Sequence, residues 1–101
     1  DTLSLHDALP IFDVVRKGLV AVNEAGTGRR VFAGAPYTSG GKTGTANSDN
    51  IRTPYAWFIA WADNPEVAVC VFVQDAEMEA TDVAGGRVAA PIAKAVIEAL
   101  R

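Results

Sequence analysis

Hydroxyl, ammonium and amide side chains are concentrated in one short segment, TSGGKTGTANSDN, at residues 38–50. Ser39 lies three residues before Lys42, a spacing that lets an amine take the proton of a nucleophilic hydroxyl when both lie on one helical turn. Lys42-Thr43-Gly44 and Ser48-Asp49-Asn50 add further groups that could bind a ligand. The segment therefore contains either one compressed reactive site or one functional pattern beside two coincidental ones.

A phosphate-binding loop is the first interpretation of Gly40-Gly41-Lys42-Thr43-Gly44. The pattern G-x-x-x-x-G-K-[ST] requires glycine at position 36, where this chain has Pro36, and a helix after the lysine. The segment that follows, GTANSDNIRTP, contains glycine, asparagines and proline instead. A P-loop nucleotide-binding protein therefore remains an alternative with little support.

An edge strand facing a cleft is the second interpretation of the same segment. Lys42 would supply positive potential, and the hydroxyls of Thr43 and Thr45 could hydrogen-bond a ligand carboxylate. Gly44 would let the backbone of a ligand approach closely. A lone Lys-Thr-Gly is a weak signal, so the surrounding elements must decide between a site and a solvated turn.

The composition predicts one small globular domain. The 101 residues are 50% apolar and 21% charged, with a net charge of −3 and a pI near 4.9. The chain has no basic run, so a nucleic-acid partner has no support. Cys70 is its only cysteine, which excludes an intrachain disulfide and a Cys-rich metal site. Its apolar runs are far shorter than the ~20 residues that span a bilayer.

The first eleven residues, DTLSLHDALPI, resemble the translation of a common sequencing adapter over their whole length. Foreign segments are set aside before a fold is predicted. We therefore interpret residues 1–11 as an adapter-derived artefact, with an amphipathic lead-in as the alternative. On this interpretation His6 has no catalytic part, and removing the two charges of Asp1 and Asp7 changes the net charge from −3 to −1.

Residues 12–46 predict one helix followed by two strands. Apolar residues recur at spacings of three and four between Phe12 and Ala25, and Gly26-Thr27-Gly28 is expected to end the helix. Residues 29–35 are a possible strand, and Pro36 separates them from a second one at residues 38–46. Residues 47–54 read as a polar loop.

Two segments, YAWFIAWA at residues 55–62 and EVAVCVFVQ at residues 66–74, predict a β-hairpin. Both are rich in aromatic and β-branched residues, and the intervening Asp63-Asn64-Pro65 has turn chemistry. Both faces are apolar, so the sheet is expected to be covered on both sides. One face is expected to carry Trp57, Ile59, Trp61, Val67, Val69, Val71 and Val73, and the other Phe58, Cys70 and Phe72 among alanines.

A closing helix is predicted by RVAAPIAKAVIEALR, after an acidic loop at residues 75–82 and Gly85-Gly86. Pro91 lies close enough to the helix start for its missing N–H to cost little. The expected apolar stripe consists of Val88, Ile92, Val96 and Leu100.

The order of these features over residues 12–101 resembles the carboxy-terminal part of a penicillin-binding protein transpeptidase domain, most closely the class B, monofunctional type of actinobacteria. The landmarks are Gly26-Thr27, the run from Gly41 to Ala46, Ala56-Trp57-Phe58, Pro65 before a Val/Ala strand, and Gly85-Gly86 before Ala90-Pro91-Ile92. The resemblance implies an α+β fragment of the penicillin-binding transpeptidase and serine β-lactamase-like fold, with helices packed on the faces of an antiparallel sheet. It also implies that Trp57 and Trp61 are core residues and that Cys70 is buried.

The resemblance identifies Lys42-Thr43-Gly44 as the third active-site motif. It implies that Thr43 and Thr45, next to Ala46, would hold the terminal carboxylate of a D-Ala-D-Ala stem peptide or of a β-lactam. The N–H of Thr45 would be one oxyanion-hole donor. In this family the nucleophilic serine begins a helix and the Ser-x-Asn motif precedes Lys-Thr-Gly, so Ser39 and Ser48-Asp49-Asn50 are interpreted as turn and loop residues. No nucleophile, metal or organic cofactor is expected in this chain.

By the same resemblance the parent protein would be a serine-type D,D-transpeptidase that cross-links peptidoglycan stem peptides. The fragment alone would be inactive, and the missing strands would leave an unpaired apolar edge prone to aggregation. The parent would act at the extracytoplasmic face of the bacterial cell membrane, anchored by a missing amino-terminal segment and beside a membrane glycosyltransferase. The alternatives are a class A bifunctional penicillin-binding protein, a carboxypeptidase, a penicillin sensor, or a family-derived binding module without chemistry.

Overall fold

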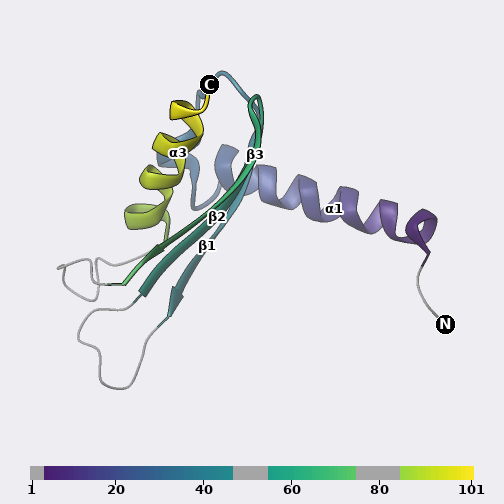
Figure 1. Cartoon of the computed structure of the whole chain (residues 1–101). Helices are drawn as coiled ribbons and strands as arrows, with labels where there is room; N and C mark the ends of the chain where they lie inside the picture. The colour runs from purple at the N-terminus through teal and green to yellow at the C-terminus, as the bar shows by residue number, and fades with distance from the viewer. Residues whose placement is uncertain (1–3, 47–54, 75–84) are drawn as a thin grey trace.

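Three antiparallel strands and the helices around them make up the computed structural model, which describes residues 4–46, 55–74 and 85–101 (Figure 1). The strand order is β1-β2-β3. This arrangement confirms the predicted α+β class. The predicted loops at residues 47–54, with Ser48-Asp49-Asn50, and at residues 75–82 lie outside the described residues. The elements are α1 (Leu5–Glu24), α2 (Arg29–Phe32), β1 (Ser39–Ala46), β2 (Tyr55–Asp63), β3 (Glu66–Val73), a π-helical turn η2 (Gly85–Ala89) and α3 (Ala90–Ala99).

Helix α1 begins earlier than predicted, at Leu5 instead of Phe12, and so includes part of the adapter-like segment. The Ser4 hydroxyl caps it by accepting a hydrogen bond of 3.1 Å from the N–H of Asp7. The expected end at Gly26-Thr27-Gly28 is confirmed, because the N–H groups of both glycines bond to carbonyls of the last helical turn. Figure 1 shows the amino-terminal half of α1 projecting away from the sheet.

The segment expected to form a strand at residues 29–35 is instead the single helical turn α2, so that prediction was wrong. The N–H groups of Val31 and Phe32 both bond to the carbonyl of Gly28, which closes the turn. Phe32 is buried and stacks on Phe58 with a ring-centroid distance of 5.8 Å. Burial of this aromatic ring outweighs the weak strand preference of the segment.

The predicted second strand and the predicted hairpin are confirmed. In β1, Ser39 pairs with Ala62 and Ala46 with Tyr55, while in the hairpin Asp63 pairs with Glu66 across the Asn64-Pro65 turn. β1 and β3 are the two outer strands of the described sheet.

The register overturns the predicted assignment of side chains to faces. Phe58 pairs with Val71 and Ile59 with Cys70, so even-numbered residues of β2 share a face with odd-numbered residues of β3. Because the turn between the strands has two residues, each odd-numbered residue of one strand pairs with an even-numbered residue of the other. The prediction had placed odd-numbered residues of both strands on the same face. The valines therefore lie with Phe58, and the tryptophans lie with Cys70 and Phe72.

The helix-covered face is the side of the sheet that carries Ala56, Phe58, Ala60, Ala62 and Val71, all buried. Three of these residues are alanines, whose small side chains let α3 approach the strands closely. The helix meets them with Ala90, Ala93 and Ile97. The predicted stripe was therefore wrong at Ile92, Val96 and Leu100, which are exposed, whereas Val88 is partly buried and packs against the core.

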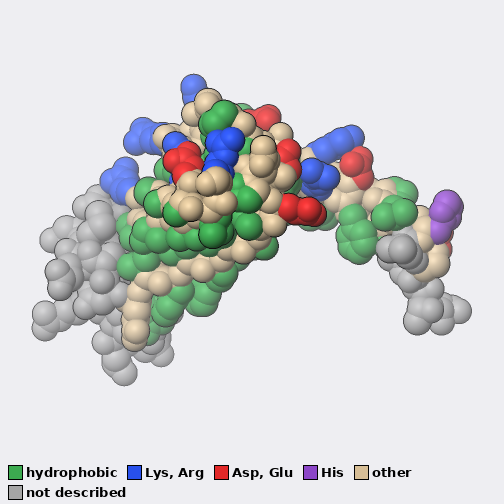
Figure 2. Space-filling view, turned by 45° about the horizontal axis from the view of Figure 1, so that its top comes forward, with side chains coloured by type: hydrophobic (Ala, Val, Ile, Leu, Met, Phe, Trp, Pro, Cys, Tyr) green, Lys and Arg blue, Asp and Glu red, His purple; other side chains and the backbone are tan. Residues whose placement is uncertain are grey.

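The open face is the opposite side, which carries Trp57, Ile59, Trp61, Cys70 and Phe72. Helix α1 covers only its hairpin end, where the Arg16 guanidinium lies 4.7 Å from the Trp61 ring centroid. Trp57, Ile59 and Phe72 remain 39%, 50% and 43% exposed, and Cys70 is exposed as well. The expected burial of Trp57 and Cys70 was therefore wrong for the described residues, and Figure 2 shows hydrophobic side chains at the surface over the strands.

Among the described segments, no helix is both long and apolar enough to cross a membrane.

Candidate functional site

The run Lys42-Thr43-Gly44-Thr45 lies within β1, and its side chains alternate between the two faces of the sheet. Lys42 pairs with Ile59 and belongs to the open face. Thr43 pairs with Phe58 and Thr45 with Ala56, so both threonines belong to the helix-covered face. Because β1 is an outer strand, a ligand at its free edge could contact side chains from both faces.

The ammonium group of Lys42 is exposed, and its Nζ donates a hydrogen bond of 2.9 Å to the backbone carbonyl of Thr43. This bond holds the cation close to β1. The lysine therefore supplies positive charge next to the strand.

A pocket of about 400 Å³ lies on the other side of the strand. Its hydroxyls come from β1 and from the turn after α1, and the Thr27 and Thr43 Oγ1 atoms are 3.5 Å apart. We call this space the threonine pocket; it is lined by Thr27, Arg30, Val31, Thr43, Thr45, Gly86 and Arg87.

Gly86 holds η2 close to this pocket. A Cβ atom at position 86 would lie 2.6 Å from the Thr27 carbonyl oxygen and 3.4 Å from the Thr43 Cγ2 atom. Only a glycine allows this approach without a shift of the backbone. The second glycine of the Gly85-Gly86 pattern therefore has a steric role beside Thr43.

The remaining predicted site residues, Gly44 and Ala46, also belong to β1. Gly44 pairs with Trp57, and a Cβ atom there would make an ordinary contact of 3.4 Å with the Trp57 Cβ. Ala46 is the last residue of the strand and pairs with Tyr55. The structure thus brings all five predicted site residues onto one strand, with its polar side chains divided between two faces.

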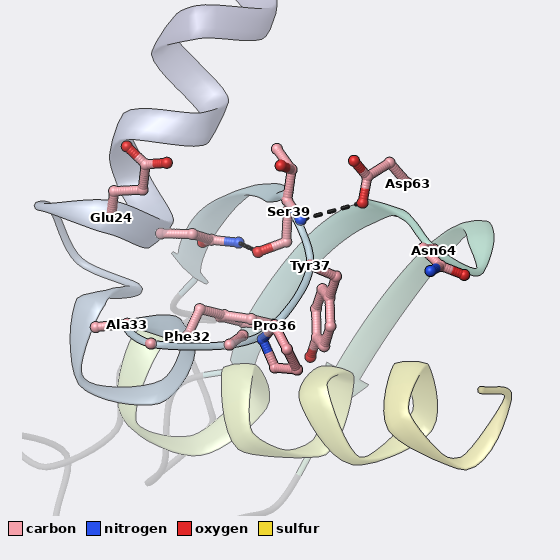
Figure 3. A pocket seen from close by; sticks show the side chains of 12 residues that line it. Glu24, Phe32, Ala33, Pro36, Tyr37, Ser39, Asp63 and Asn64 are labelled. Atoms are coloured by element: carbon pink, nitrogen blue, oxygen red, sulfur yellow. Dashed lines mark hydrogen bonds between the residues drawn. The ribbon is translucent and has the colours of Figure 1, made fainter.

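Ser39 is the first residue of β1 and not a turn residue, which corrects the prediction. Its side chain is 6% exposed, and its Oγ accepts a hydrogen bond of 2.9 Å from Asn23 Nδ2 (Figure 3). Three positions separate Ser39 from Lys42 on a strand, so the two side chains lie on opposite faces. This geometry does not let Lys42 take a proton from Ser39.

A larger pocket, of about 610 Å³, adjoins Ser39 and is lined by Asn23, Glu24, Tyr37 and Asp63 among others (Figure 3). Asp63 is engaged there, because its Oδ1 accepts a hydrogen bond of 3.0 Å from the N–H of Thr38. Partial burial raises the pKa of the Tyr37 hydroxyl, and the neighbouring Glu98 carboxylate adds to the rise. The described residues of this region offer no nucleophile paired with a base.

The structure also decides against a phosphate-binding loop. Lys42 and Thr43 lie inside a strand of eight residues, and no helix begins at the position where a phosphate would be held. Within the described ranges no three His, Cys, Asp or Glu side chains come together as metal ligands.

Arg30 and Arg87 line the threonine pocket and were not among the residues predicted from the sequence. Arg30 belongs to α2, which precedes β1, and Arg87 belongs to η2, which follows β3; neither arginine has a spacing that relates it to Lys42. The landmarks Gly26-Thr27 and Gly85-Gly86 had no assigned role in the sequence. Gly85-Gly86 lies immediately before Arg87, and Gly26-Thr27 lies shortly before Arg30. Their proximity to Thr43 was therefore a usable signal only once the fold was known.

The family profile described as the penicillin binding protein transpeptidase domain matches residues 11–98. The chain is 40% identical over 86 residues to the peptidoglycan D,D-transpeptidase PbpA of Mycolicibacterium smegmatis, a match that covers 80% of this chain and 17% of the relative. It is 31% identical over 105 residues to the peptidoglycan D,D-transpeptidase MrdA of Haemophilus influenzae, covering 86% of this chain and 15% of the relative. A third relative, PbpA of Mycobacterium tuberculosis, is 48% identical over 63 residues, which cover 57% of this chain and 13% of the relative.

The matches thus span less than a fifth of each of these relatives. No solved structure gives a significant match to the chain.

Proposed function

The chain belongs to the family of penicillin-binding protein transpeptidase domains, and from that premise we propose that it is part of a peptidoglycan D,D-transpeptidase. In this proposal Lys42-Thr43-Gly44-Thr45 forms one wall of the site for serine acyl transfer. The observation that carries the proposal is the arrangement of β1, an outer strand with an exposed ammonium on one face and two threonine hydroxyls in a pocket on the other.

The reaction would proceed through an acyl-enzyme. A serine elsewhere in the parent protein attacks the carbonyl carbon of the penultimate D-Ala of a stem peptide, and the terminal D-Ala leaves with a proton. The amine of a neighbouring stem peptide then attacks the ester, which forms the cross-link and regenerates the serine hydroxyl. A β-lactam would acylate the same serine.

Residues of β1 would act at two points of this reaction. The backbone N–H of Thr45 would donate to the oxyanion that develops at the attacked carbonyl, a type of contact whose loss costs about 100- to 1,000-fold in rate. The hydroxyls of Thr43 and Thr45 would bind the terminal carboxylate, and Lys42 would supply positive potential.

The chain alone is expected to be inactive. Ser39 is buried, hydrogen-bonded to Asn23 and on the face opposite Lys42, so it lacks the arrangement of an activated nucleophile. The serine that reacts would come from another part of the parent protein.

The place of action and the partners are part of the same proposal. The parent protein would work on the extracytoplasmic side of the bacterial cell membrane, where stem peptides are found, beside a glycosyltransferase that polymerises the glycan.

Covalent labelling by a fluorescent penicillin tests the proposed function. In a chimera, residues 12–101 replace the matching segment of the M. smegmatis PbpA, which supplies the rest of its own domain. We expect a labelled band from the chimera and none from the 101-residue chain alone. A chimera that unfolds cooperatively on heating but never labels would contradict the proposal, and so would a chain that labels by itself.

A further inference from the structure

The threonine pocket has two cationic residues on its walls in addition to its hydroxyls. Arg30 comes from α2 and Arg87 from η2, and the fold brings both to the pocket that Thr43 and Thr45 line. Thr27 adds a third hydroxyl, 3.5 Å from that of Thr43. The pocket therefore combines neutral hydrogen-bonding groups with guanidinium groups.

Among the described residues that line this pocket, the charged ones are both arginines. No carboxylate belongs to the described lining, and Glu24 and Asp63 line the separate pocket near Ser39. Lys42 lies on the same strand, β1, with its side chain on the opposite face of the sheet. This distribution favours an anionic group in the pocket.

The guanidinium groups and the hydroxyl groups recognise different features of a ligand. A threonine hydroxyl can hydrogen-bond either a carboxylate or a carboxamide, because both groups accept hydrogen bonds. A guanidinium group is always charged and presents a planar fork of donors that matches the two oxygens of a carboxylate. Discrimination between an acid and an amide would therefore depend on the arginines.

We propose that Arg30 is a specificity-determining residue of this site, and that it pairs with the free terminal carboxylate of the stem peptide held by Thr43 and Thr45. The proposal rests on the proposed function and extends it, because it explains how a peptide with a free carboxyl end is preferred to one whose end is blocked. Arg87 would contribute charge from η2, next to Gly86.

Arg30 has a neighbour that serves as a matched control. Arg29 precedes it on the same helical turn and is also exposed, but Arg29 does not line the threonine pocket. Replacing either arginine by glutamine removes one positive charge from the same element. Only the change at position 30 should affect the ligand.

The experiment is an NMR titration of the full 101-residue chain, followed through the backbone amide signals of Thr43 and Thr45. The probes are N-acetyl-D-Ala-D-Ala, its carboxamide derivative and N-acetyl-L-Ala-L-Ala. We expect the D,D acid to bind about tenfold more tightly than its amide at low salt, since charge-assisted hydrogen bonds are about twice as strong as neutral ones. This preference should shrink when the ionic strength is raised to about 0.5 M, where screening is stronger.

Substitutions at positions 29 and 30 test which arginine causes the preference for the acid over the amide. Arg30→Gln should remove most of the acid preference while the amide still binds, and Arg30→Lys should restore only part of it, because an ammonium lacks the planar fork. Arg29→Gln should retain the preference of the unsubstituted chain. Equal loss in the Arg29→Gln and Arg30→Gln variants would overturn the proposal, because the effect would then be one of net charge.

The same titration separates the failure of this inference from the failure of the proposed function. If D,D and L,L acids bind equally but both exceed the amide, the acid selectivity assigned to Arg30 stands, while stem-peptide recognition by this strand, and with it the proposed function, is contradicted. If the D,D acid and D,D amide bind equally and better than the L,L acid, the role of Arg30 is wrong and the proposed function stands. A chain whose Thr43 and Thr45 signals respond to none of the probes contradicts both.

Discussion

At the scale of single residues, position on a strand decides what a reactive side chain can do. Ser39 and Lys42 have the spacing of a nucleophile and its base on a helix, but β1 places them on opposite faces of the sheet. The buried hydrogen bond from Asn23 gives Ser39 a structural role instead. Thr43 and Thr45, two residues apart, share a pocket for the same geometric reason.

Replacing Ser39 by alanine tests this structural role. The change leaves Asn23 Nδ2 without its acceptor, while Asn23 Oδ1 already has no hydrogen-bond partner in the described structure. We expect the free energy of unfolding to fall by about 1–3 kcal/mol, the usual cost of a buried unpaired polar group. Urea unfolding measures it.

Thr38→Ala is the control for this change. The Thr38 side chain is exposed, and its hydrogen bond to Asp63 is made by the backbone N–H, which alanine retains. Its free energy of unfolding should change by less than about 0.5 kcal/mol. Equal values for the two variants would mean that the Asn23–Ser39 bond contributes nothing.

At the scale of elements, the close approach of η2 to the turn after α1 shapes the threonine pocket. In Gly86→Ala, the new Cβ would lie 2.6 Å from the Thr27 carbonyl oxygen, so the backbone must shift. We expect a loss of about 1–3 kcal/mol in the free energy of unfolding, as for other overpacked sites. Chemical denaturation of the variant checks this loss.

Gly18→Ala should change the same quantity in the opposite direction. Nothing lies within 4 Å of a Cβ atom at position 18, in the middle of α1, so no clash arises. Alanine in a helix is more favourable than glycine by about 0.5–1 kcal/mol. A Gly86→Ala variant as stable as Gly18→Ala would contradict the tight contact between η2 and Thr27.

The elements also show how far the sequence could be interpreted. The hairpin was predictable, because runs of aromatic and β-branched residues bounded by turn residues specify strands locally. The segment of β1, SGGKTGTA, contains no such run, and its local pattern was weak. The single turn α2 was not predictable, because the burial of Phe32 against Phe58 depends on a contact between segments far apart in the chain. The buried stripe of α3 was missed for a related reason. The helix packs closely on the alanines of β2 mainly through its own alanines, whereas the prediction from hydrophobic periodicity was based on its large apolar residues.

The candidate site was predictable to a similar extent. The strand that carries Lys42, Thr43 and Thr45 followed from the order of landmarks along the chain, because its local pattern was weak. Arg30 and Arg87 could not be assigned, because only the tertiary fold brings their segments to β1.

At the scale of the whole molecule, the two faces of the sheet differ in what covers them. The helix-covered face is buried under α3 and η2, while the open face exposes Trp57, Ile59 and Phe72 beyond the end that α1 covers. An exposed apolar surface of this kind favours association. We therefore expect the isolated chain to self-associate through the open face.

Ile59→Thr and Val71→Thr distinguish the faces, since each introduces a hydroxyl at a β-branched position of the sheet. Ile59 is 50% exposed, so its variant should self-associate less in sedimentation velocity experiments and unfold at nearly the same urea concentration. Val71 is 8% exposed on the helix-covered face, so its variant should lose about 1–3 kcal/mol through burial of the hydroxyl. The reverse pattern would contradict the strand register.

We propose that Lys42, and not Ser39, belongs to the acyl-transfer machinery of the parent protein. The most direct test is the rate of acylation by fluorescent penicillin of the chimera with the M. smegmatis PbpA, measured for Lys42→Ala and Ser39→Ala below their unfolding temperatures. We expect a fall of about 100-fold or more for Lys42→Ala, the scale of losing one electrostatic contact in a transition state, and an unchanged rate for Ser39→Ala. Loss of labelling in Ser39→Ala with normal labelling in Lys42→Ala would contradict it.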